Sequence, residues 1–449
     1  MKGNLMTFPD GFLWGAATAS YQIEGAALED GRGECIWTRF SHTPGKVVNG
    51  DTGDVADDHY HRYPQDVALM KELGLKAYRY SISWPRVIPL GTGATNPLGL
   101  DFYDRLTDEI LKAGVQPWVT LYHWDLPQAL EDKGGWTNPD IVGWFSEYTE
   151  LITKRLGDRV KHWITLNEPW CSASLGYLYG NHAPGLQDPK KAFAAAHYLL
   201  RSHGAAMKII RRNVPDAKAG ITVNLAPHMP ATNHPDDVRV ALRGDGFQNR
   251  WYLDPVFKGQ YPPDIVEEVM AQGGLAGIDL NEVREAQQPA DFLGINYYMR
   301  QVVAHVPGKP DESQTAFPPD AQFTDMGWEV NGAAMADLLV RVQREYNPKA
   351  IYITENGAAY PEPETVSEAV LEDPSRVAFL KEYFTAAQDA IKRGAKLEGY
   401  FVWSFLDNFE WAFGYTKRFG IVHVDYKTQK RTPKRSALYL KDIIRTNEI

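Results

Sequence analysis

Two short segments each place a glutamate at the end of an apolar, β-rich run. Residues 165–169 read T-L-N-E-P and residues 353–357 read I-T-E-N-G, so Glu168 and Glu355 are each followed closely by a residue that breaks regular structure. Cleavage of a glycosidic bond needs such a pair, because one carboxyl group protonates the leaving oxygen while the other attacks the anomeric carbon or activates a water. A single glutamate in such a place often only ends a strand. Two such segments in one chain favour a catalytic pair.

The composition is that of a large folded chain with excess negative charge. The 449 residues are 44% hydrophobic and 23% charged, so a large core can be buried. The formal net charge of −10 argues against nucleic acid or an anionic membrane as the main partner. Because the composition stays even along the chain, without a linker or a short repeat, we expect a single catalytic domain over residues 1–449.

Neither a membrane anchor nor a secretory leader is expected. No run approaches the length of a transmembrane helix, about 18 consecutive apolar residues. The N-terminal segment M-K-G-N-L-M-T-F-P-D-G-F lacks the continuous apolar core of a secretory signal. These features predict a cytoplasmic protein. The oligomeric state is left open between a monomer and a homo-oligomer.

Cysteine and histidine residues give weaker alternatives. Cys35 and Cys171 are too few for a disulfide scaffold and form no paired C-x-x-C metal site, which suits a reducing compartment. Cys171 lies three residues after Glu168, but no cysteine–histidine arrangement accompanies it. His59 and His61 could hold a metal ion, although their tyrosine and arginine neighbours favour a packed, hydrogen-bonded turn before a helix. No metal or organic cofactor is expected for cleavage by a carboxyl pair, because a proton activates the leaving group and a carboxylate forms the covalent intermediate.

Apolar β-rich runs alternate with segments of helical spacing. The expected strands are residues 12–17, 76–80, 116–122, 163–167, 220–224, 292–297, 351–354 and 400–404, and the expected helices are residues 66–73, 100–113, 139–155, 190–213, 333–345, 376–393 and 434–445. Eight strands of this kind predict an α/β fold, a closed parallel (β/α)8 TIM barrel with long βα loops. The main rival is an open, doubly wound sheet. No G-x-G-x-x-G motif follows the first strand, so a dinucleotide site is disfavoured.

In such a barrel the active site lies at the carboxyl ends of the strands. The expected strand ends carry a set of polar and aromatic residues, each of which alone would suggest only a structural role. They are Gln22, Arg79, His123, Trp124, Asn167, Glu168, Asn296, Tyr298, Glu355, Trp403, Glu410 and Trp411. Their convergence at one rim favours a binding and catalytic site over separate structural roles.

Motifs along nearly the whole chain also match a known family. The first half contains F-P-D-G-F-L-W-G-A-A-T-A-S-Y-Q-I-E-G, Y-R-Y-S-I-S-W-P-R, T-L-Y-H-W-D-L-P and T-L-N-E-P, and the second half contains N-Y-Y, I-T-E-N-G and W-S-F-L-D-N-F-E-W. These motifs resemble those of the β-glycosidases of glycoside hydrolase family 1. The resemblance implies β-glucosidase activity on a small-molecule sugar.

The resemblance also implies residue roles. Glu168 would be the acid/base and Glu355 the nucleophile of a retaining double displacement through a covalent glycosyl-enzyme. Arg79, Asn296 and Tyr298 would support the nucleophile. The implied sugar-binding residues are Gln22, His123, Trp124, Asn167, Trp403, Glu410, Trp411 and Phe419.

The chemistry sets requirements for this pair. The nucleophile must be ionised while the acid is protonated, so the two environments must separate their pKa values. Arg79 and the Tyr298 hydroxyl would favour the charged form of Glu355, whereas its charge would raise the pKa of Glu168. Retention also requires carboxyl groups about 5–5.5 Å apart.

The length of the chain, well beyond the roughly 250 residues of a typical barrel, predicts long loops that build a deep pocket. A pocket favours exo-cleavage of terminal non-reducing β-D-glucosyl residues from cellobiose, short oligosaccharides and aryl glycosides, as in cellulose degradation. Activity on β-galactosyl or β-fucosyl residues is also expected. Candidate residues around the entrance are Trp170, Cys171, Leu175, Tyr177 and Trp328.

Three other functions remain as alternatives. A non-catalytic sugar-binding barrel would have no reason to contain both glutamates in these settings. A transglycosylase would use the same glycosyl-enzyme and would differ only in the acceptor. A barrel oxidoreductase or aldolase would need a flavin or phosphate site or a Schiff-base lysine, and no lysine lies at the end of the sixth expected strand.

Overall fold

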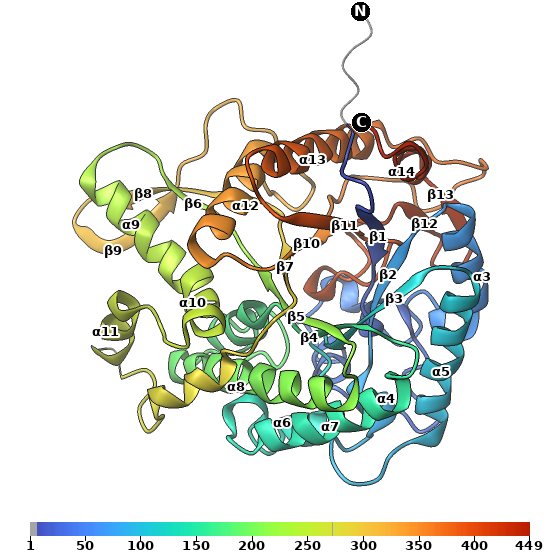
Figure 1. Ribbon diagram of the computed structural model, residues 1–449, viewed down its shortest axis with the longest axis horizontal. Coiled ribbons are helices and arrows are strands. Elements are labelled where there is room, and N and C mark those ends of the chain that lie inside the picture. The colour runs from blue at the N-terminus through green and yellow to red at the C-terminus, as the bar shows by residue number, and fades with distance from the viewer. Residues whose placement is uncertain (1–6, 272) are drawn as a thin grey trace, which may run out of the picture.

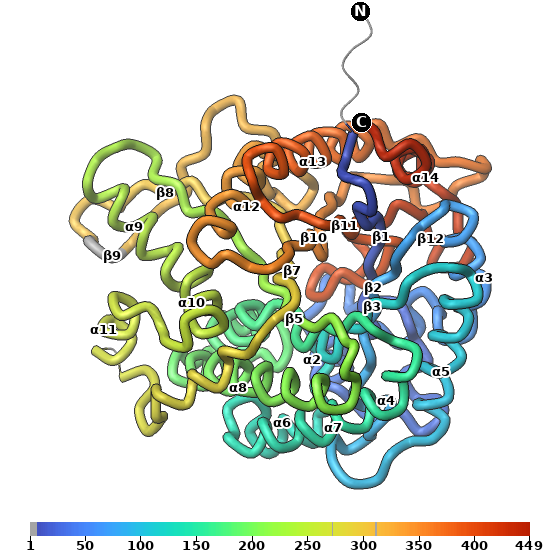
Figure 2. Tube along the Cα trace, viewed as in Figure 1, coloured from blue at the N-terminus to red at the C-terminus, as the bar shows by residue number. Residues whose placement is uncertain are grey.

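The computed structural model describes residues 7–271 and 273–449, whose course Figures 1 and 2 show. Within these ranges, eight parallel strands close into a barrel in the order β1-β2-β3-β4-β5-β7-β10-β11. The barrel strands are β1 (Leu13–Ala17), β2 (Ala77–Ser81), β3 (Gln116–Tyr122), β4 (His162–Asn167), β5 (Lys218–Asn224), β7 (Phe292–Asn296), β10 (Ile351–Asn356) and β11 (Leu397–Trp403). Because β1 pairs with both β2 and β11, the sheet has no free edge. The predicted (β/α)8 TIM barrel is confirmed, and the rival open sheet is wrong.

Helices follow the strands, and the longer helices cover the outside of the barrel (Figure 1). They are α1 (Ser20–Ile23), α2 (Ile36–Ser41), α3 (His59–Glu72), α4 (Trp84–Val87), α5 (Pro97–Lys112), α6 (Gln128–Glu131), α7 (Ile141–Leu156), α8 (Pro189–Asn213), α12 (Gly332–Tyr346), α13 (Pro374–Lys392) and α14 (Arg435–Thr446). The longest, α8, begins where the Asp188 carboxylate accepts the backbone N–H of Lys190 at 2.9 Å, with Pro189 in the first turn. None of the helices in the described ranges has the length and apolar character needed to cross a membrane.

One helix begins earlier than predicted. The expected helix over residues 66–73 is α3, which starts at His59 and continues through Pro64. Side-chain bonds hold this first turn: the buried His59 ring contacts the Asp66 carboxylate at 2.7 Å, and the exposed His61 contacts Asp58 at 2.6 Å. The expectation that the two histidines lie in a turn before the helix is therefore wrong. Because one ring is buried and the other exposed, they do not face a common ion.

Aromatic rings fill the barrel near the amino ends of several strands. Trp118 lies 5.1 Å from Phe292, 4.8 Å from Tyr352 and 5.1 Å from Phe401, measured between ring centroids. These rings come from β3, β7, β10 and β11, so they form packing contacts across the interior of the barrel. Because aromatic rings fill this part of the barrel, the polar site lies at the carboxyl ends of the strands.

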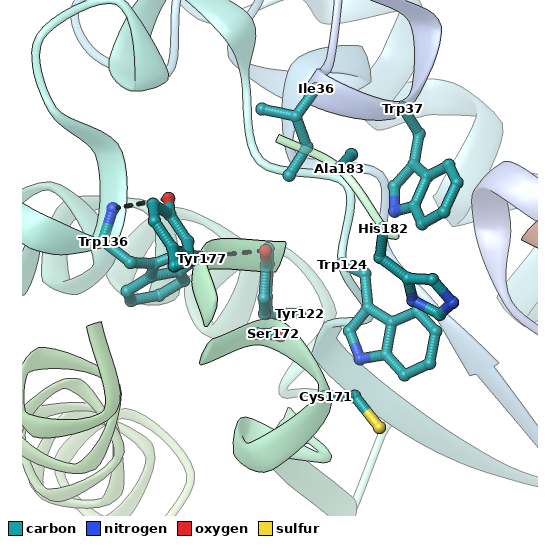
Figure 3. A pocket seen from close by; sticks show the side chains of 10 residues that line it. All are labelled: Ile36, Trp37, Tyr122, Trp124, Trp136, Cys171, Ser172, Tyr177, His182 and Ala183. Atoms are coloured by element: carbon teal, nitrogen blue, oxygen red, sulfur yellow. Dashed lines mark hydrogen bonds between the residues drawn. The ribbon is translucent and has the colours of Figure 1, made fainter. Parts of the chain in front are cut away.

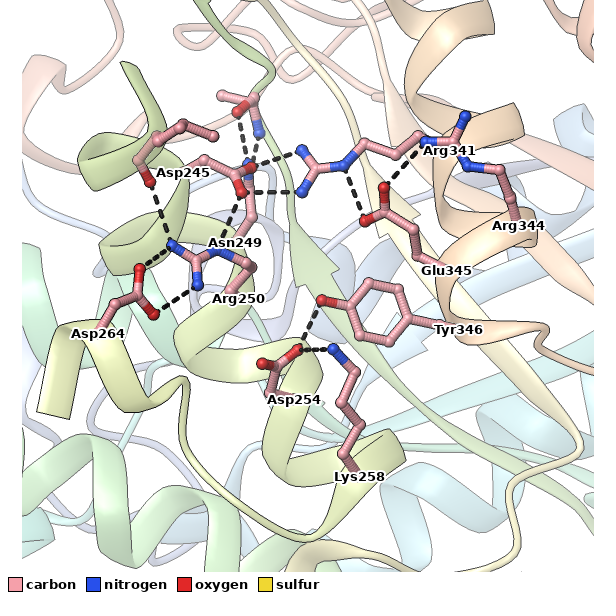
Figure 4. Close-up of polar contacts among 12 residues, drawn as sticks. Asp245, Asn249, Arg250, Asp254, Lys258, Asp264, Arg341, Arg344, Glu345 and Tyr346 are labelled. Atoms are coloured by element: carbon pink, nitrogen blue, oxygen red, sulfur yellow. Dashed lines mark hydrogen bonds and ion pairs between the residues drawn. The ribbon is translucent and has the colours of Figure 1, made fainter. Parts of the chain in front are cut away.

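Two long excursions leave the barrel after β5 and β7. The further elements of the chain are β6 (His228–Pro230), α9 (Pro235–Asp245), η4 (Gly246–Arg250), α10 (Trp251–Lys258), α11 (Pro263–Ala271), η5 (Leu280–Ala286), β8 (Gln301–Val306), β9 (Lys309–Thr315), β12 (Val422–Val424), β13 (Arg431–Pro433), η1 (Val48–Gly50), η2 (Gly135–Thr137), η3 (Cys171–Leu178) and η6 (Trp411–Phe413). Strands β6, β8 and β9 form a small sheet beside α9. Figure 4 shows how the end of α9 is fastened to the barrel helix α12: both terminal nitrogens of Arg341 bind the Asp245 carboxylate, at 2.6 and 2.8 Å.

A close backbone approach explains the glycine of the I-T-E-N-G motif and gives a test of the fold. A Cβ atom on Gly357 would lie 1.6 Å from the carbonyl oxygen of Trp403. Gly357→Ala should therefore lower the free energy of unfolding by about 2 kcal/mol or more, because two fixed backbones would have to separate. The measurement is urea-induced unfolding. Gly143→Ala is the control, since a Cβ there contacts nothing within 4 Å inside α7 and should be neutral or slightly stabilising. Equal stability of the two variants would contradict this account.

Candidate active site

A pocket of about 360 Å³ opens at the carboxyl ends of the barrel strands. Its volume lies within the usual range for small-molecule sites, about 300–1,000 Å³. The lining residues are His123, Trp124, Glu168, Trp170, Cys171, Leu175, Asn181, His182, Asn224, Leu225, Ala226, Gln248, Asn296, Tyr298, Met299, Gln301, Met326, Trp328, Glu355, Trp403, Glu410, Trp411, Phe413 and Phe419. Three fully buried residues do not line the pocket but form hydrogen bonds with residues that do: Gln22 with Glu410, Arg79 with Glu355, and Asn167 with Asn296.

Glu355 lies at the end of β10 and is paired with a buried cation. Arg79 from β2 donates through Nη1 to Glu355 Oε1 at 2.6 Å, and the Tyr298 hydroxyl donates to Oε2 at 2.7 Å. Burial raises the pKa of Glu355, whereas the charge of Arg79 and the hydrogen bond from Tyr298 favour the ionised form and oppose that rise. Burial also raises the pKa of Tyr298 well above its usual value, so the hydroxyl keeps the proton that it donates.

Glu168 follows β4 in a setting that favours its protonated form. Burial and, next in size, the charge of Glu355 raise the pKa of Glu168 to about 8. Two donors oppose this rise: the Cys171 thiol donates to Oε2 at 2.9 Å, and Asn296 Nδ2 donates to Oε1 at 2.5 Å. Near neutral pH the pocket therefore holds a carboxylic acid at Glu168, while Arg79 favours a carboxylate at Glu355. One group can give a proton while the other acts as an anion.

The neighbouring amide of Asn167 determines where His123 carries its proton. Asn167 Oδ1 accepts from Arg79 Nη2 at 2.6 Å and from Asn296 Nδ2 at 3.0 Å, which fixes the amide orientation. Asn167 Nδ2 then donates to His123 Nε2 at 3.0 Å, so the ring proton is on Nδ1. Burial lowers the pKa of His123 well below its usual value, which keeps the ring neutral. Within the described residues Nδ1 has no hydrogen-bond partner, so its N–H is available to a bound molecule.

A second polar group is formed by Gln22 and Glu410. Gln22 Nε2 donates to the carbonyl oxygen of Phe409 at 2.9 Å and to Asn408 Oδ1 at 3.0 Å, and it lies 3.5 Å from Glu410 Oε2. Gln22 Oε1 is buried and has no partner in the described ranges. Burial and then the charge of Glu355 raise the pKa of Glu410 to about 8. These groups can both donate and accept hydrogen bonds, as sugar hydroxyls require.

Indole rings supply apolar area in the same pocket. Trp403, at the end of β11, is nearly parallel to the His123 ring, with centroids 5.8 Å apart. Trp411, in η6, lies 4.6 Å from Trp124. Flat aromatic faces beside hydrogen-bonding groups suit a ring that is apolar on its faces and polar on its edges.

Three residues of the pocket have a positive φ angle, a backbone conformation that residues other than glycine rarely adopt. The φ angle is +79° at Trp124, +48° at Glu168 and +50° at Trp411. Each such conformation costs free energy, of order 1–3 kcal/mol, and persists only where the surrounding structure holds it. The strained positions therefore coincide with the carboxylic acid and two of the indole rings.

Comparison with known proteins agrees with this geometry. The family model described as glycosyl hydrolase family 1 matches residues 4–449. The chain belongs to glycosyl hydrolase family 1. Among its relatives, a β-glucosidase A from Thermotoga maritima is 49% identical over 447 residues, which are 99% of this chain and 99% of that protein. A bifunctional β-D-glucosidase/β-D-fucosidase from Bifidobacterium breve is 42% identical, with 96% of both chains covered.

Solved structures show the same family likeness. The family 1 β-glucosidase from Thermotoga maritima in complex with isofagomine lactam superposes with a TM-score of 0.95 at 47% sequence identity. The superposition covers 99% of this chain and 100% of the other. The barrel that carries the pocket described above is therefore the same fold as that of the chain solved in complex with isofagomine lactam.

The outer wall of the pocket contains residues that the sequence did not predict. They are Asn181, His182, Asn224, Leu225, Ala226, Gln248, Met299, Gln301, Met326 and Phe413. The strand-end rule could have found Asn224, because it ends an expected strand. Leu225, Ala226, Gln248, Met299, Gln301 and Met326 come from the two excursions, whereas Asn181 and His182 lie between η3 and α8 and Phe413 lies in η6. No motif marks these positions.

Tyr177 is placed differently from the prediction. It was expected near the entrance, but it is buried beside a separate cavity of about 10 Å³, which Figure 3 shows. Its hydroxyl donates to Glu131 Oε2 at 2.5 Å. Residues Cys171–Leu178 form a π-helix, whose i→i+5 hydrogen bonds alter which side chains share a face. Cys171 therefore borders both the pocket and the small cavity, whereas Tyr177 borders only the cavity.

The thiol beside Glu168 gives a pH prediction. Cys171→Ala removes a donor that favours the charged form of Glu168, so the pKa of Glu168 should rise. Glu168 would then hold its proton to higher pH, and the alkaline limb of kcat/KM should move upward by about 0.5–1 pH unit, as expected for a bond worth about 1 kcal/mol. The measurement is the pH profile with an aryl β-glycoside. Cys35→Ala removes the other buried thiol and should leave that limb in place; an unchanged or lowered limb in Cys171→Ala would refute the assignment.

Proposed function

We propose that this chain is a retaining, exo-acting β-glucosidase that works by double displacement through a covalent glycosyl-enzyme. The observation that carries the proposal is the pair of buried carboxyl groups in opposed settings. Arg79 and Tyr298 bind Glu355, while burial and the charge of Glu355 raise the pKa of Glu168 to about 8. A nucleophile and a proton donor need these two settings at one pH.

The two steps follow from those settings. In the first, Glu355 attacks the anomeric carbon while Glu168 gives its proton to the departing glycosidic oxygen, and an ester bond forms. The charge of Glu355 is then gone, so the pKa of Glu168 falls and Glu168 becomes able to accept a proton. In the second step Glu168 takes a proton from water, the water oxygen bonds to the anomeric carbon, and the ester bond breaks.

The substrate class is inferred from the polar groups around the pocket. His123 Nδ1 and Gln22 Oε1 are a buried donor and a buried acceptor without partners in the described ranges, and Glu410 adds a carboxyl group. We assign these atoms to the hydroxyls of one terminal sugar, with Trp403 under its ring. The name of the Bifidobacterium breve relative supports acceptance of β-fucosides beside β-glucosides.

A pocket of this size also favours small substrates. Its volume of about 360 Å³ suits a sugar and part of a leaving group, so cellobiose, short oligosaccharides and aryl glycosides are the proposed substrates. Trp170, Leu175 and Trp328 would contact the leaving group. We propose that residues 1–449 act as one catalytic unit.

The anomer that is released tests the proposed mechanism. Hydrolysis of an aryl β-D-glucoside should release β-glucose, observed by proton NMR before mutarotation. Retention is expected because two inversions occur at the same carbon. Release of α-glucose would mean that a water, not Glu355, attacks the substrate, and absence of turnover would favour the non-catalytic sugar-binding alternative.

Azide rescue tests which carboxylate attacks. Glu355→Ala should reduce kcat by roughly 10⁴-fold or more, and azide should restore turnover to a glycosyl azide of inverted configuration, because the anion enters through the vacated face. Glu168→Ala is the matched variant. With a good leaving group it should still form the glycosyl-enzyme, and azide should then give the retained product. Exchange of these two configurations would reverse the assigned roles.

A further inference from the structure

A group of potential metal ligands lies outside the pocket, where α9 meets β8. His234 precedes α9, Asp236 lies in its first turn, and His305 lies on β8. Each offers one ligand atom, and these atoms all lie within 4.8 Å of one another. We propose that these three side chains bind a divalent transition-metal ion of the Zn²⁺ type. The ion would have no part in glycoside cleavage.

The two distances from Asp236 to the histidines need little change to accept an ion. Asp236 Oδ2 lies 3.6 Å from His234 Nδ1 and 3.8 Å from His305 Nε2. Ligands placed tetrahedrally at usual zinc bond lengths of about 2.0–2.2 Å are about 3.3–3.5 Å apart. The two imidazole rings are nearly parallel, at 12°, with centroids 5.7 Å apart. Movements of a few tenths of an ångström would bring Asp236 to ligand spacing from each histidine. The two histidine nitrogens lie within 4.8 Å of each other and would have to approach by up to about 1.5 Å.

A neighbouring carboxylate already orients one of the ligands. Asp237 Oδ1 accepts the backbone N–H of His305 at 2.8 Å and lies 3.3 Å from His305 Nδ1. The Thr232 hydroxyl donates to the other oxygen of Asp237 at 2.6 Å. With the proton of His305 on Nδ1, the Nε2 lone pair faces Asp236. A carboxylate that orients a histidine in this way is the usual second layer of a metal site.

The local charges suit a divalent cation. The amino end of a helix carries partial positive charge, which opposes a cation there. Asp236 and Asp237 offset this effect, and Asp236 directs Oδ2 to the histidines while Oδ1 binds Arg239 at 3.3 Å. The ion would displace one weak bond, the 3.3 Å contact between the Asp236 N–H and His234 Nδ1. Two imidazoles and one carboxylate are a ligand set for zinc, copper, nickel or iron, and they leave a position for water.

The place of the group in the fold indicates what the ion would do. Figures 1 and 2 show α9 beside β8 at one side of the molecule. The carboxyl end of α9 is already fastened to the barrel through Asp245 and Arg341 (Figure 4). The ion would fasten the amino end to β8, whose first residue, Gln301, lines the pocket. It would therefore add a further link between the two excursions, which build much of the outer wall.

Calorimetric titration of Zn²⁺ into chelator-treated, untagged protein tests the proposal. The wild type should bind close to one ion per chain, and Zn²⁺ should raise its thermal unfolding midpoint. His234→Ala and His305→Ala should each weaken binding at least tenfold and remove the rise in midpoint. Asp237→Asn should weaken binding about 10–100-fold, as loss of an orienting carboxylate does.

His42→Ala is the matched control, because His42 is an exposed histidine with a single carboxylate partner elsewhere on the surface. It should bind Zn²⁺ as the wild type does. Binding that is unchanged in His234→Ala would place the ion elsewhere and overturn the proposal, as would an absence of saturable binding to the wild type. His234 is exposed, so His234→Ala should fold normally and keeps the test valid if His305→Ala does not fold.

Discussion

A buried guanidinium links the closure of the barrel to the arrangement of its site. Arg79 on β2 donates to Thr120 on β3, Asn167 on β4, and Thr354 and Glu355 on β10. Strands β2 and β10 are not hydrogen-bonded neighbours, so these partners meet only when the barrel closes. Loss of one partner of a buried ion pair costs about 3–5 kcal/mol, because the other charge is left uncompensated. Strand register and site geometry are therefore one constraint.

The same cation accounts for the division of protonation states. Glu168, Glu355 and Glu410 line one pocket, and Arg79 binds Glu355 directly. Like charges in a buried site cannot all ionise easily, so the group beside the guanidinium ionises first and its charge opposes the others. The pKa values of about 8 at Glu168 and Glu410 follow from burial together with that charge. An acid and an anion thus arise from the same residue type.

Features that depend on residues close together in the sequence could be predicted, whereas features that depend on contacts between distant segments could not. The strands were predictable because strands that are covered on both faces appear in the sequence as continuous apolar runs. Glu168 and Glu355 were placed at the same end of the barrel because each follows such a run. The start of α3 was missed because Pro64 lies inside the helix, where a proline usually indicates a helix boundary, and the His59–Asp66 contact joins residues that are seven positions apart. The outer wall was missed because its residues come from four separate loops, after β4, β5, β7 and β11, which only the folded barrel brings together.

The pocket therefore has two parts under different physical control. The inner part lies at strand ends, and its charges depend on barrel register. Much of the outer part comes from the two excursions, which are held by contacts such as Asp245 with Arg341 and Asp237 with His305. Those contacts do not involve Glu168 or Glu355, so changes in the excursions can alter the outer part of the pocket while the acid and the anion keep their settings. In this arrangement barrel register controls the charges in the inner part of the pocket, and the excursions control much of the shape of the outer part.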